Sequence, residues 1–186
     1  MLETIVGIGG LVSGTVLPLA DRIFGAAERA KALNLSFDVK MKALYFEVTT
    51  NLRTLAVVDC GKLTPRNLAP LAASLELETC AAILFSDDKK NAEVKDFLAL
   101  KGKIEVEDEE VEKPAGNKQK SVLQAMLFIV QRVIALQKIA AVYTGEESAL
   151  IAVRIPVRVK NLKEHLEFLR KKLREFNKEK QFLFEE

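Results

Sequence analysis

The segment from Ser121 to Tyr143 constrains the fold most, because its apolar residues recur at alternating steps of four and three. Such spacing places side chains along one face of an α-helix. The repeat consists of Val122, Met126, Ile129, Val133, Leu136, Ala140 and Tyr143, and the stripe is widened by Leu123, Leu127, Val130 and Ile134. Only Arg132 and Lys138 bring charge into the segment. A helix this apolar belongs in the centre of a helical bundle, and its two charges argue against a membrane span.

Three other segments carry apolar residues at helical spacing, which predicts four long amphipathic helices in all. Besides 121–143, these segments are 4–33, 36–59 and 161–178. Ser36 is a typical N-cap residue. Two shorter helices are predicted between them, one ending near Phe85 and one ending near Leu100. The sequence therefore predicts an all-α fold, with residues 1–186 forming a single helical-bundle domain.

Residues 101–120 form the clearest interruption of the helical pattern. They combine turn-forming glycine, proline and asparagine with an acidic run from Glu105 to Glu112. A long stretch of this composition predicts a flexible, exposed acidic loop. An alternative stays open, in which 103–108 pairs as a strand with 151–159, because apolar and charged residues alternate in both. We favour a helix that is broken near Pro156 over that strand pairing.

The residue counts exclude several classes of site. His165 is the only histidine, so a single chain cannot supply two histidines to a metal ion. Cys60 and Cys80 lie in apolar helical settings, and we expect both to be buried in a reduced, cytoplasmic protein. The sequence has no phosphate-binding loop, no complete dinucleotide fingerprint and no nucleophile elbow. We therefore expect no metal and no cofactor, and the net charge of +2 selects no class of partner.

Residues 4–20 form an uncharged, glycine-rich segment that indicates contact with a membrane or with another helix. Gly10 and Gly14 share one helix face, which lets a second helix approach closely. Because the segment is at the lower length limit for crossing a bilayer, we favour a buried first helix of the bundle over a membrane span. The arrangement loosely resembles the HeLo-type and related bacterial helical cell-death domains, whose apolar N-terminus is released to attack membranes. That resemblance implies a membrane-active stretch containing Ile5, Val6, Gly10, Gly14 and Leu17.

The single histidine near the start of the last long helix is a second lead. Asn161 and His165 are preceded by the cations Arg158 and Lys160. This arrangement is similar to the motif of HEPN-type ribonucleases, helical bundles in which an arginine, a polar residue and a histidine lie near the start of a late helix. Lys160 stands where that family has arginine, and Arg158 is followed by valine instead of a polar residue. The resemblance implies a dimeric ribonuclease in which His165 moves a proton and a cation stabilises phosphate charge. Otherwise His165 is a solvated side chain on the helix flank.

Two further features concern polar residues on helices. The last helix carries a tight basic cluster that could hold anionic lipid headgroups or pair with acidic residues of the chain. This cluster consists of Arg170, Lys171, Lys172 and Arg174. Asn51 falls in register with the apolar stripe of 36–59, where it is either buried and fixes the register or lies at the edge of the stripe.

These observations favour a non-enzymatic helical bundle that acts by association with a partner protein, with itself or with a membrane surface. The expected contact residues are Gly10, Gly14, Leu17 and the basic cluster of the last helix. The alternative is a divergent HEPN-like ribonuclease that acts on RNA through His165, Asn161, Arg158 and Lys160. We expect a cytoplasmic protein that can associate with membranes.

Overall fold

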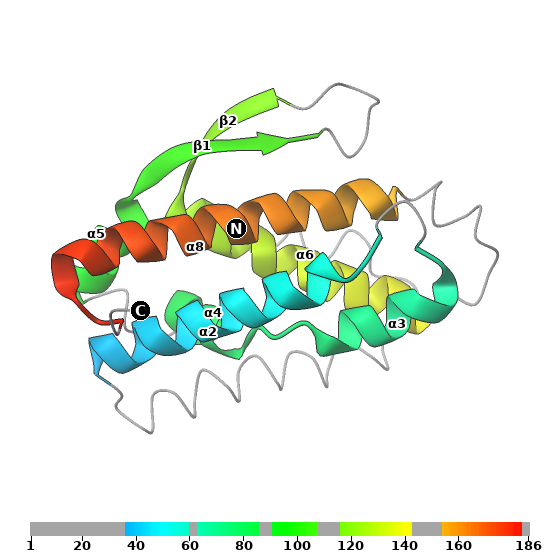
Figure 1. Cartoon of the computed structure of the whole chain (residues 1–186), viewed down its shortest axis with the longest axis horizontal. Helices are drawn as coiled ribbons and strands as arrows, with labels where there is room; N and C mark the ends of the chain where they lie inside the picture. The colour runs from blue at the N-terminus through cyan, green and yellow to red at the C-terminus, as the bar shows by residue number, and fades with distance from the viewer. Residues whose placement is uncertain (1–35, 60–62, 86–90, 108–115, 143–153, 184–186) are drawn as a thin grey trace.

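Three long helices, α2 (Phe37–Ala56), α6 (Val122–Val142) and α8 (Ile155–Lys180), enclose most of the hydrophobic core (Figure 1). The computed structural model describes residues 36–59, 63–85, 91–107, 116–142 and 154–183. The apolar stripe predicted for α6 is confirmed, since Val122, Met126, Ile129, Val133 and Leu136 are all buried. They face a similar stripe on α8, formed by Ile155, Val159, Leu162, Leu166, Leu169 and Leu173.

Shorter elements complete the described part of the chain. They are α3 (Pro65–Ser74), α4 (Glu78–Phe85), α5 (Ala92–Ala99), β1 (Lys101–Val106) and β2 (Gly116–Ser121). Six helices and one pair of strands in these residues confirm the predicted all-α class with a minor strand element. The helix predicted over 4–33 lies outside the described residues.

The N-cap predicted at Ser36 is confirmed. Its hydroxyl oxygen accepts a hydrogen bond from the Val39 N–H at 3.5 Å, so one of the free donors of the first turn of α2 is satisfied. The helix ends at Ala56, slightly before the predicted end near Asp59. At α5 the cap is Asn91, whose side chain accepts from the Glu93 N–H at 2.9 Å.

The helix predicted to end near Phe85 is divided into α3 and α4, which are inclined to each other by 51°. The break falls at residues 75–77, and the peptide groups of Glu76 there are bound by the side chain of Asn51 on α2. Because this side chain is hydrogen-bonded to both the N–H and the C=O of Glu76, those groups are not available for the hydrogen bonds of a continuous helix. The break is therefore set by a contact with a distant helix.

The last helix is longer than predicted and has no break. Pro156 lies in its first turn, where the missing N–H would have no helical partner, so the proline is accommodated without loss of a hydrogen bond. The helix begins at Ile155, directly before Pro156, and the residues that would form a helix ahead of this point lie outside the described part of the chain, so the predicted break near Pro156 stays a prediction. The alternative of a strand is wrong over the described part of 151–159, because that part is helical from Ile155.

The prediction of a flexible loop over 101–120 is also wrong for the described residues. Residues 101–106 form β1, which pairs antiparallel with β2 and not with 151–159, with Ile104 opposite Lys118 and Val106 opposite Gly116. Alternation explains the strand, because Ile104 and Val106 are buried while Lys103 and Glu105 are exposed. The hairpin lies on the side of α8 that faces away from α2 (Figure 1).

Two contacts attach this hairpin to α8. A side chain at Gly102 would bring its Cβ within 2.7 Å of the Phe168 ring, so only glycine allows β1 to approach this closely. At the other end of β1, the buried side chain of Asn161 accepts from the Glu107 N–H at 2.9 Å and donates to the Glu107 C=O at 2.8 Å. The amide thus closes the strand end much as a neighbouring strand would.

We predict that Asn161→Ala lowers the free energy of unfolding by about 1–3 kcal/mol, because it leaves both main-chain groups of Glu107 without their partners. Urea denaturation with a matched change at the exposed Asn117 of β2 measures the effect. Asn117→Ala should cost less than about 0.5 kcal/mol. Equal effects of the two substitutions would contradict the assigned role of Asn161.

Candidate functional site

The structure buries the single histidine. His165 is 1% exposed, and its ring stacks on Phe128 with centroids 3.8 Å apart. Its Nδ1 lies 2.7 Å from the carbonyl oxygen of Asn161, while its Nε2 finds no hydrogen-bond partner in the described residues. The expectation of a solvated side chain is therefore wrong. Burial lowers the pKa of His165 to about 4, so the ring is neutral at physiological pH.

The other residues of the ribonuclease hypothesis are close by but engaged in structural contacts. The Asn161 amide holds Glu107, as described above, and Lys160 forms an ion pair with the side chain of the same glutamate. Arg158 is half-buried and has an interaction partner. The geometry thus gives Asn161, Lys160 and His165 roles in holding the hairpin and the core.

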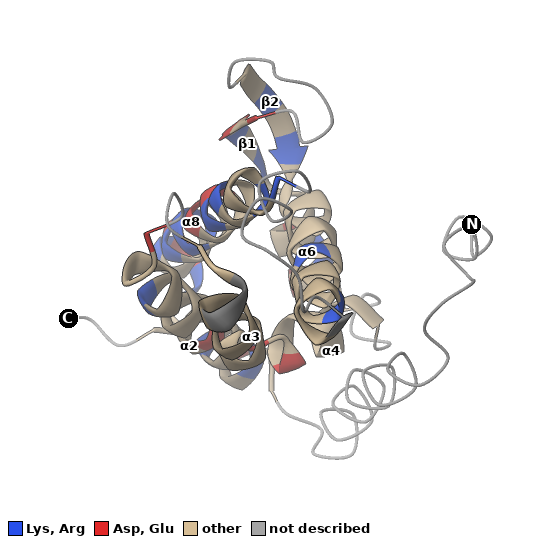
Figure 2. Ribbon diagram, turned by 90° about the vertical axis from the view of Figure 1, so that its right-hand side faces the viewer, with Lys and Arg blue, Asp and Glu red and all other residues tan. Residues whose placement is uncertain are grey.

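Lysines and arginines are frequent along α8 (Figure 2), and two of the four cations in the predicted basic cluster are paired with glutamates. Arg170 pairs with Glu167 at 2.5 Å, and Lys172 pairs with Glu175 at 2.6 Å. The third cation, Arg174, donates to the hydroxyl of Tyr45 at 3.1 Å. The fourth, Lys171, is exposed. The predicted contacts Gly10, Gly14 and Leu17 lie outside the described residues.

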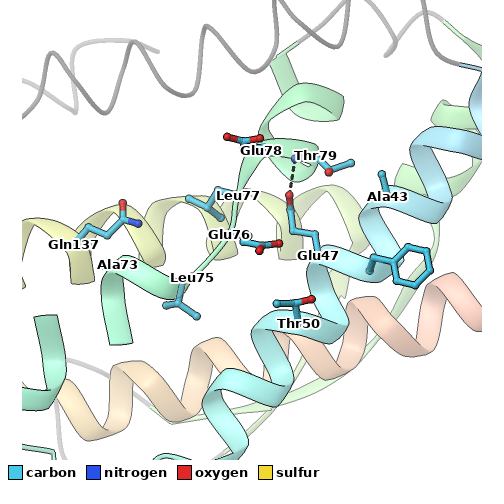
Figure 3. A pocket seen from close by; sticks show the side chains of 11 residues that line it. Ala43, Glu47, Thr50, Ala73, Leu75, Glu76, Leu77, Glu78, Thr79 and Gln137 are labelled. Atoms are coloured by element: carbon cyan, nitrogen blue, oxygen red, sulfur yellow. Dashed lines mark hydrogen bonds between the residues drawn. The ribbon is translucent and has the colours of Figure 1, made fainter. Parts of the chain in front are cut away.

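A pocket that the sequence analysis missed lies between α2, the 75–77 link, α4 and α6 (Figure 3). Its volume is about 530 Å³. We call it the α2–α4 pocket, and its lining residues are as follows. The apolar lining includes Ala43, Phe46, Ala73, Leu75 and Leu77, and the polar lining includes Glu47, Thr50, Glu76, Glu78, Thr79 and Gln137.

Glu47 is the most buried of the polar residues that line the pocket, with 6% of its surface exposed. Its two carboxylate oxygens accept from the backbone N–H of Cys80 at 3.0 Å and of Thr79 at 2.5 Å, and the bond to Thr79 is drawn in Figure 3. These are free donors in the first turn of α4, so a side chain of α2 caps the helix. Burial nevertheless raises the pKa of Glu47 to about 7, because desolvation outweighs the two hydrogen bonds.

Two side-chain amides bind main-chain groups at or next to the pocket lining. The Asn51 side chain is buried, which confirms the first of the two alternatives for it, and its amide holds Glu76 through two hydrogen bonds of 2.8 Å. Gln137 of α6 donates to the Ala72 carbonyl oxygen at 3.1 Å, while its own Oε1 is shielded from solvent and has no partner in the described residues. The wall is thus fixed by side chains that bind main-chain groups.

The mouth of the pocket adjoins an exposed apolar stripe on α2. Phe46 is 65% exposed and Val39 is 44% exposed. Both lie on one helix face with Ala43 and Thr50, since these positions are separated by four, three and four residues. Glu76 and Glu78 are exposed beside the pocket, so its edge is acidic.

One sequence signal pointed to this site. Glu47 stands between the buried Leu44 and Val48 on the core-facing stripe of its helix, where a carboxylate needs a buried partner. Its partners on α4 are more than thirty positions away in the chain, so the spacing alone did not identify them.

The described residues were also compared with the requirements of a metal site, a reactive cysteine and a membrane span. They contain no group of three or more histidine, cysteine or acidic side chains that could hold a metal ion. Cys80 is buried as expected, and burial raises the pKa of its thiol, while Cys60 lies outside the described residues. One described helix, Val122–Ala141 within α6, is long and apolar enough to cross a membrane, as core helices of soluble proteins also are.

Comparison with known proteins finds no matching family model, no matching curated protein and no matching solved structure.

Glu47 and His165 affect the pH dependence of stability in opposite directions. The folded chain keeps the Glu47 proton up to about pH 7, whereas an unfolded carboxyl loses it near 4.5, so this group makes the fold less stable as pH rises between these values. An unfolded His165 binds a proton below about 6.5 that the folded chain binds only below about 4. This second group therefore makes the fold more stable as pH rises.

We predict that His165→Leu and Glu47→Gln shift the change in unfolding free energy between pH 4.5 and 6.5 in opposite directions. Relative to the unsubstituted chain, that change should become about 1–3 kcal/mol more negative in His165→Leu and more positive by a similar amount in Glu47→Gln. Urea denaturation at the two pH values measures both, with Glu105→Gln as an exposed control. Shifts of the same sign would contradict the assignment.

Proposed function

We propose that this protein is a non-enzymatic helical-bundle module that acts by association, and that its contact surface is the α2–α4 pocket. The ligand we propose is an apolar helix of a partner protein that carries basic residues. The observation that carries the proposal is a pocket with an apolar part, an exposed aromatic side chain in its lining and exposed glutamates beside it.

The dimensions support a binding site. A volume of about 530 Å³ lies within the range of pockets that hold drug-sized groups or protein side chains. Phe46 lies beside the mouth with 65% of its surface exposed, and large exposed aromatic residues are frequent energetic centres of interfaces. The exposed stripe from Val39 to Phe46 extends the contact along α2 by about 10 Å, which suits a helix better than a compact ligand.

The charges support a basic partner. Glu76 and Glu78 are exposed in the lining of the pocket, and the third glutamate of the lining, Glu47, is buried. Complementary charge at a rim favours encounter and orientation more than affinity, so lysine or arginine flanking an apolar helix face fits this surface. The same acidic edge disfavours an anionic membrane as the ligand of the pocket.

Neither the ribonuclease hypothesis nor the membrane hypothesis is supported by a comparable arrangement of described residues. The ribonuclease hypothesis needs an accessible His165, whose ring is 1% exposed. The membrane hypothesis relies on Gly10, Gly14 and Leu17, outside the described residues, and on a basic cluster whose cations Arg170 and Lys172 are paired with glutamates. Both stay hypotheses, and vesicle binding enters the test below as a competing outcome.

The test uses short helical peptides that share one apolar face and carry basic, neutral or acidic residues on their flanks. We predict that the full chain binds the basic peptide most tightly and the acidic peptide least tightly. Fluorescence anisotropy of labelled peptides measures the three affinities. Phe46→Asp should weaken binding of the basic peptide by about tenfold or more, because it removes the aromatic contact and places a charge in an apolar interface.

Val57→Asp is the matched control, since Val57 is 86% exposed at the end of α2 and does not line the pocket. Equal binding of the three peptides, or equal loss in both variants, would contradict the proposal. Flotation of the full chain with anionic vesicles, unchanged by Phe46→Asp and without peptide binding, would favour the membrane hypothesis instead.

A further inference from the structure

We infer that the partner helix carries a lysine or arginine within its apolar face, and that this side chain enters the α2–α4 pocket and ends at the carboxylate of Glu47. This inference rests on the proposed function, because it names the group that the same pocket selects. Three observations carry it: the burial of Glu47 in the pocket lining, its spare capacity for hydrogen bonds and an apolar lining beside it.

Glu47 is a carboxylate in the wall of a cavity and not a surface charge. It is 6% exposed, while the pocket that it lines has a volume of about 530 Å³. An apolar side chain that filled this space would remove the remaining water from the carboxylate and give its charge no partner in return. A cation at the same place compensates the buried negative charge, so the pocket selects a basic side chain over an apolar one.

The hydrogen bonds of Glu47 leave room for a further donor. An ionised carboxylate accepts about four hydrogen bonds. Glu47 accepts from the backbone N–H groups of Thr79 and Cys80, and it is also hydrogen-bonded to the Thr79 side chain. The remaining acceptor position suits one N–H of an ammonium or guanidinium group, and hydrogen bonds between charged groups are the stronger ones in proteins.

The apolar lining fits the rest of such a side chain. Lysine and arginine pack their methylene stems against apolar surface while the charged end reaches a polar group. Leu75 and Leu77 line the same pocket as Glu47, so the stem has an apolar surface to contact. Phe46 adds an exposed aromatic ring to the lining, and such rings attract cations. A basic side chain thus uses both the apolar and the polar parts of the lining.

The charges around Glu47 agree with a cationic ligand. No lysine or arginine is among the described residues that line the pocket. Burial is the largest cause of the raised pKa of Glu47, and the charge of Glu76, whose side chain extends toward Glu47 in Figure 3, adds to it. A cation beside Glu47 relieves both effects. Titratable or charged groups on the elements around Glu47 include Glu76 of the link, Glu78 and Cys80 of α4 and Arg174 of α8, which donates to Tyr45 of α2.

Binding of the basic side chain is linked to a proton. Because the pKa of Glu47 is about 7, the carboxylate is fully ionised only above this pH. Cys80 does not compete for the cation, since burial raises the pKa of its thiol and keeps it neutral. The affinity for a basic side chain is therefore full above pH 7 and falls as pH decreases through 7, by about tenfold for each pH unit.

The first test varies only the partner and leaves the chain unsubstituted. Two helical peptides share the basic flanks of the peptide in the previous subsection and differ at one central position of the apolar face, which is lysine in one and norleucine in the other. We predict that the lysine peptide binds the full chain about tenfold more tightly at pH 8, as measured by fluorescence anisotropy. Equal or tighter binding of the norleucine peptide would overturn the inference and leave the proposed function intact. Failure of both peptides to bind would overturn the inference and the proposed function together.

The second test compares the same two peptides at pH 8 and pH 6. The affinity of the lysine peptide should fall about tenfold over this range, because its cation competes with a proton for Glu47. The norleucine peptide should not weaken, since its contact with the pocket needs no ionised carboxylate. Equal weakening of both peptides, or an unchanged affinity of the lysine peptide, would overturn the inference.

The third test removes the charge with Glu47→Gln, which keeps a side chain of similar shape that can still accept a hydrogen bond from α4. We predict that this variant binds the two peptides equally and without pH dependence, whereas the exposed control Glu105→Gln keeps the preference for lysine. Circular dichroism checks that each variant is folded. A folded Glu47→Gln chain that still prefers the lysine peptide would overturn the inference. If Glu47→Gln does not fold, the two tests on the unsubstituted chain decide.

Discussion

The buried carboxylate of Glu47 joins α2 to the first turn of α4, and the geometry of the candidate site depends on this contact. Its oxygens bind the N–H groups of Thr79 and Cys80, which have no acceptor within their own helix. Without the carboxylate, these two N–H groups would lose their hydrogen-bond acceptor. Burial raises the pKa of Glu47, so desolvation of the charged carboxylate opposes this contact while the two hydrogen bonds favour it.

Two asparagines act in the same manner at other points where the chain changes direction. Asn51 binds both main-chain groups of Glu76 between α3 and α4, and Asn161 binds those of Glu107 at the end of β1. In each case a side chain on a long helix supplies the hydrogen bonds that a link would otherwise take from water. Side chains of the long helices therefore fix the ends of shorter elements. The α2–α4 pocket lies beside two of these contacts, that of Glu47 with α4 and that of Asn51 with Glu76.

The long helices could be predicted because their signal is local. Apolar residues at helical spacing identified the buried faces of α2, α6 and the later part of α8, and Ser36 was identified as a cap. The division between α3 and α4 could not be predicted, because the residue that causes it, Asn51, is 25 positions away from Glu76. The hairpin was missed because β2 is polar, and its pairing with β1 depends on the packing of Ile104 and Val106.

The candidate site was missed for the same reason. Its position follows from the contact of Glu47 with Thr79 and from the angle between two short helices, neither of which has a local signature. Conversely, His165 drew notice as the only histidine, yet its stacking on Phe128 gives it a place in the core. A rare residue type is therefore a weaker guide to the site here than a charged residue in an apolar stripe.

Amide hydrogen exchange at Thr79 and Cys80 tests the central claim most directly, namely that Glu47 holds the start of α4 and with it the wall of the pocket. The account predicts that Glu47→Leu accelerates exchange at these two amides by about tenfold or more while amides in the middle of α6 keep their protection. Glu105→Leu, at an exposed position of β1, should leave all of them unchanged. Equal protection of Thr79 and Cys80 with and without the carboxylate would contradict the account.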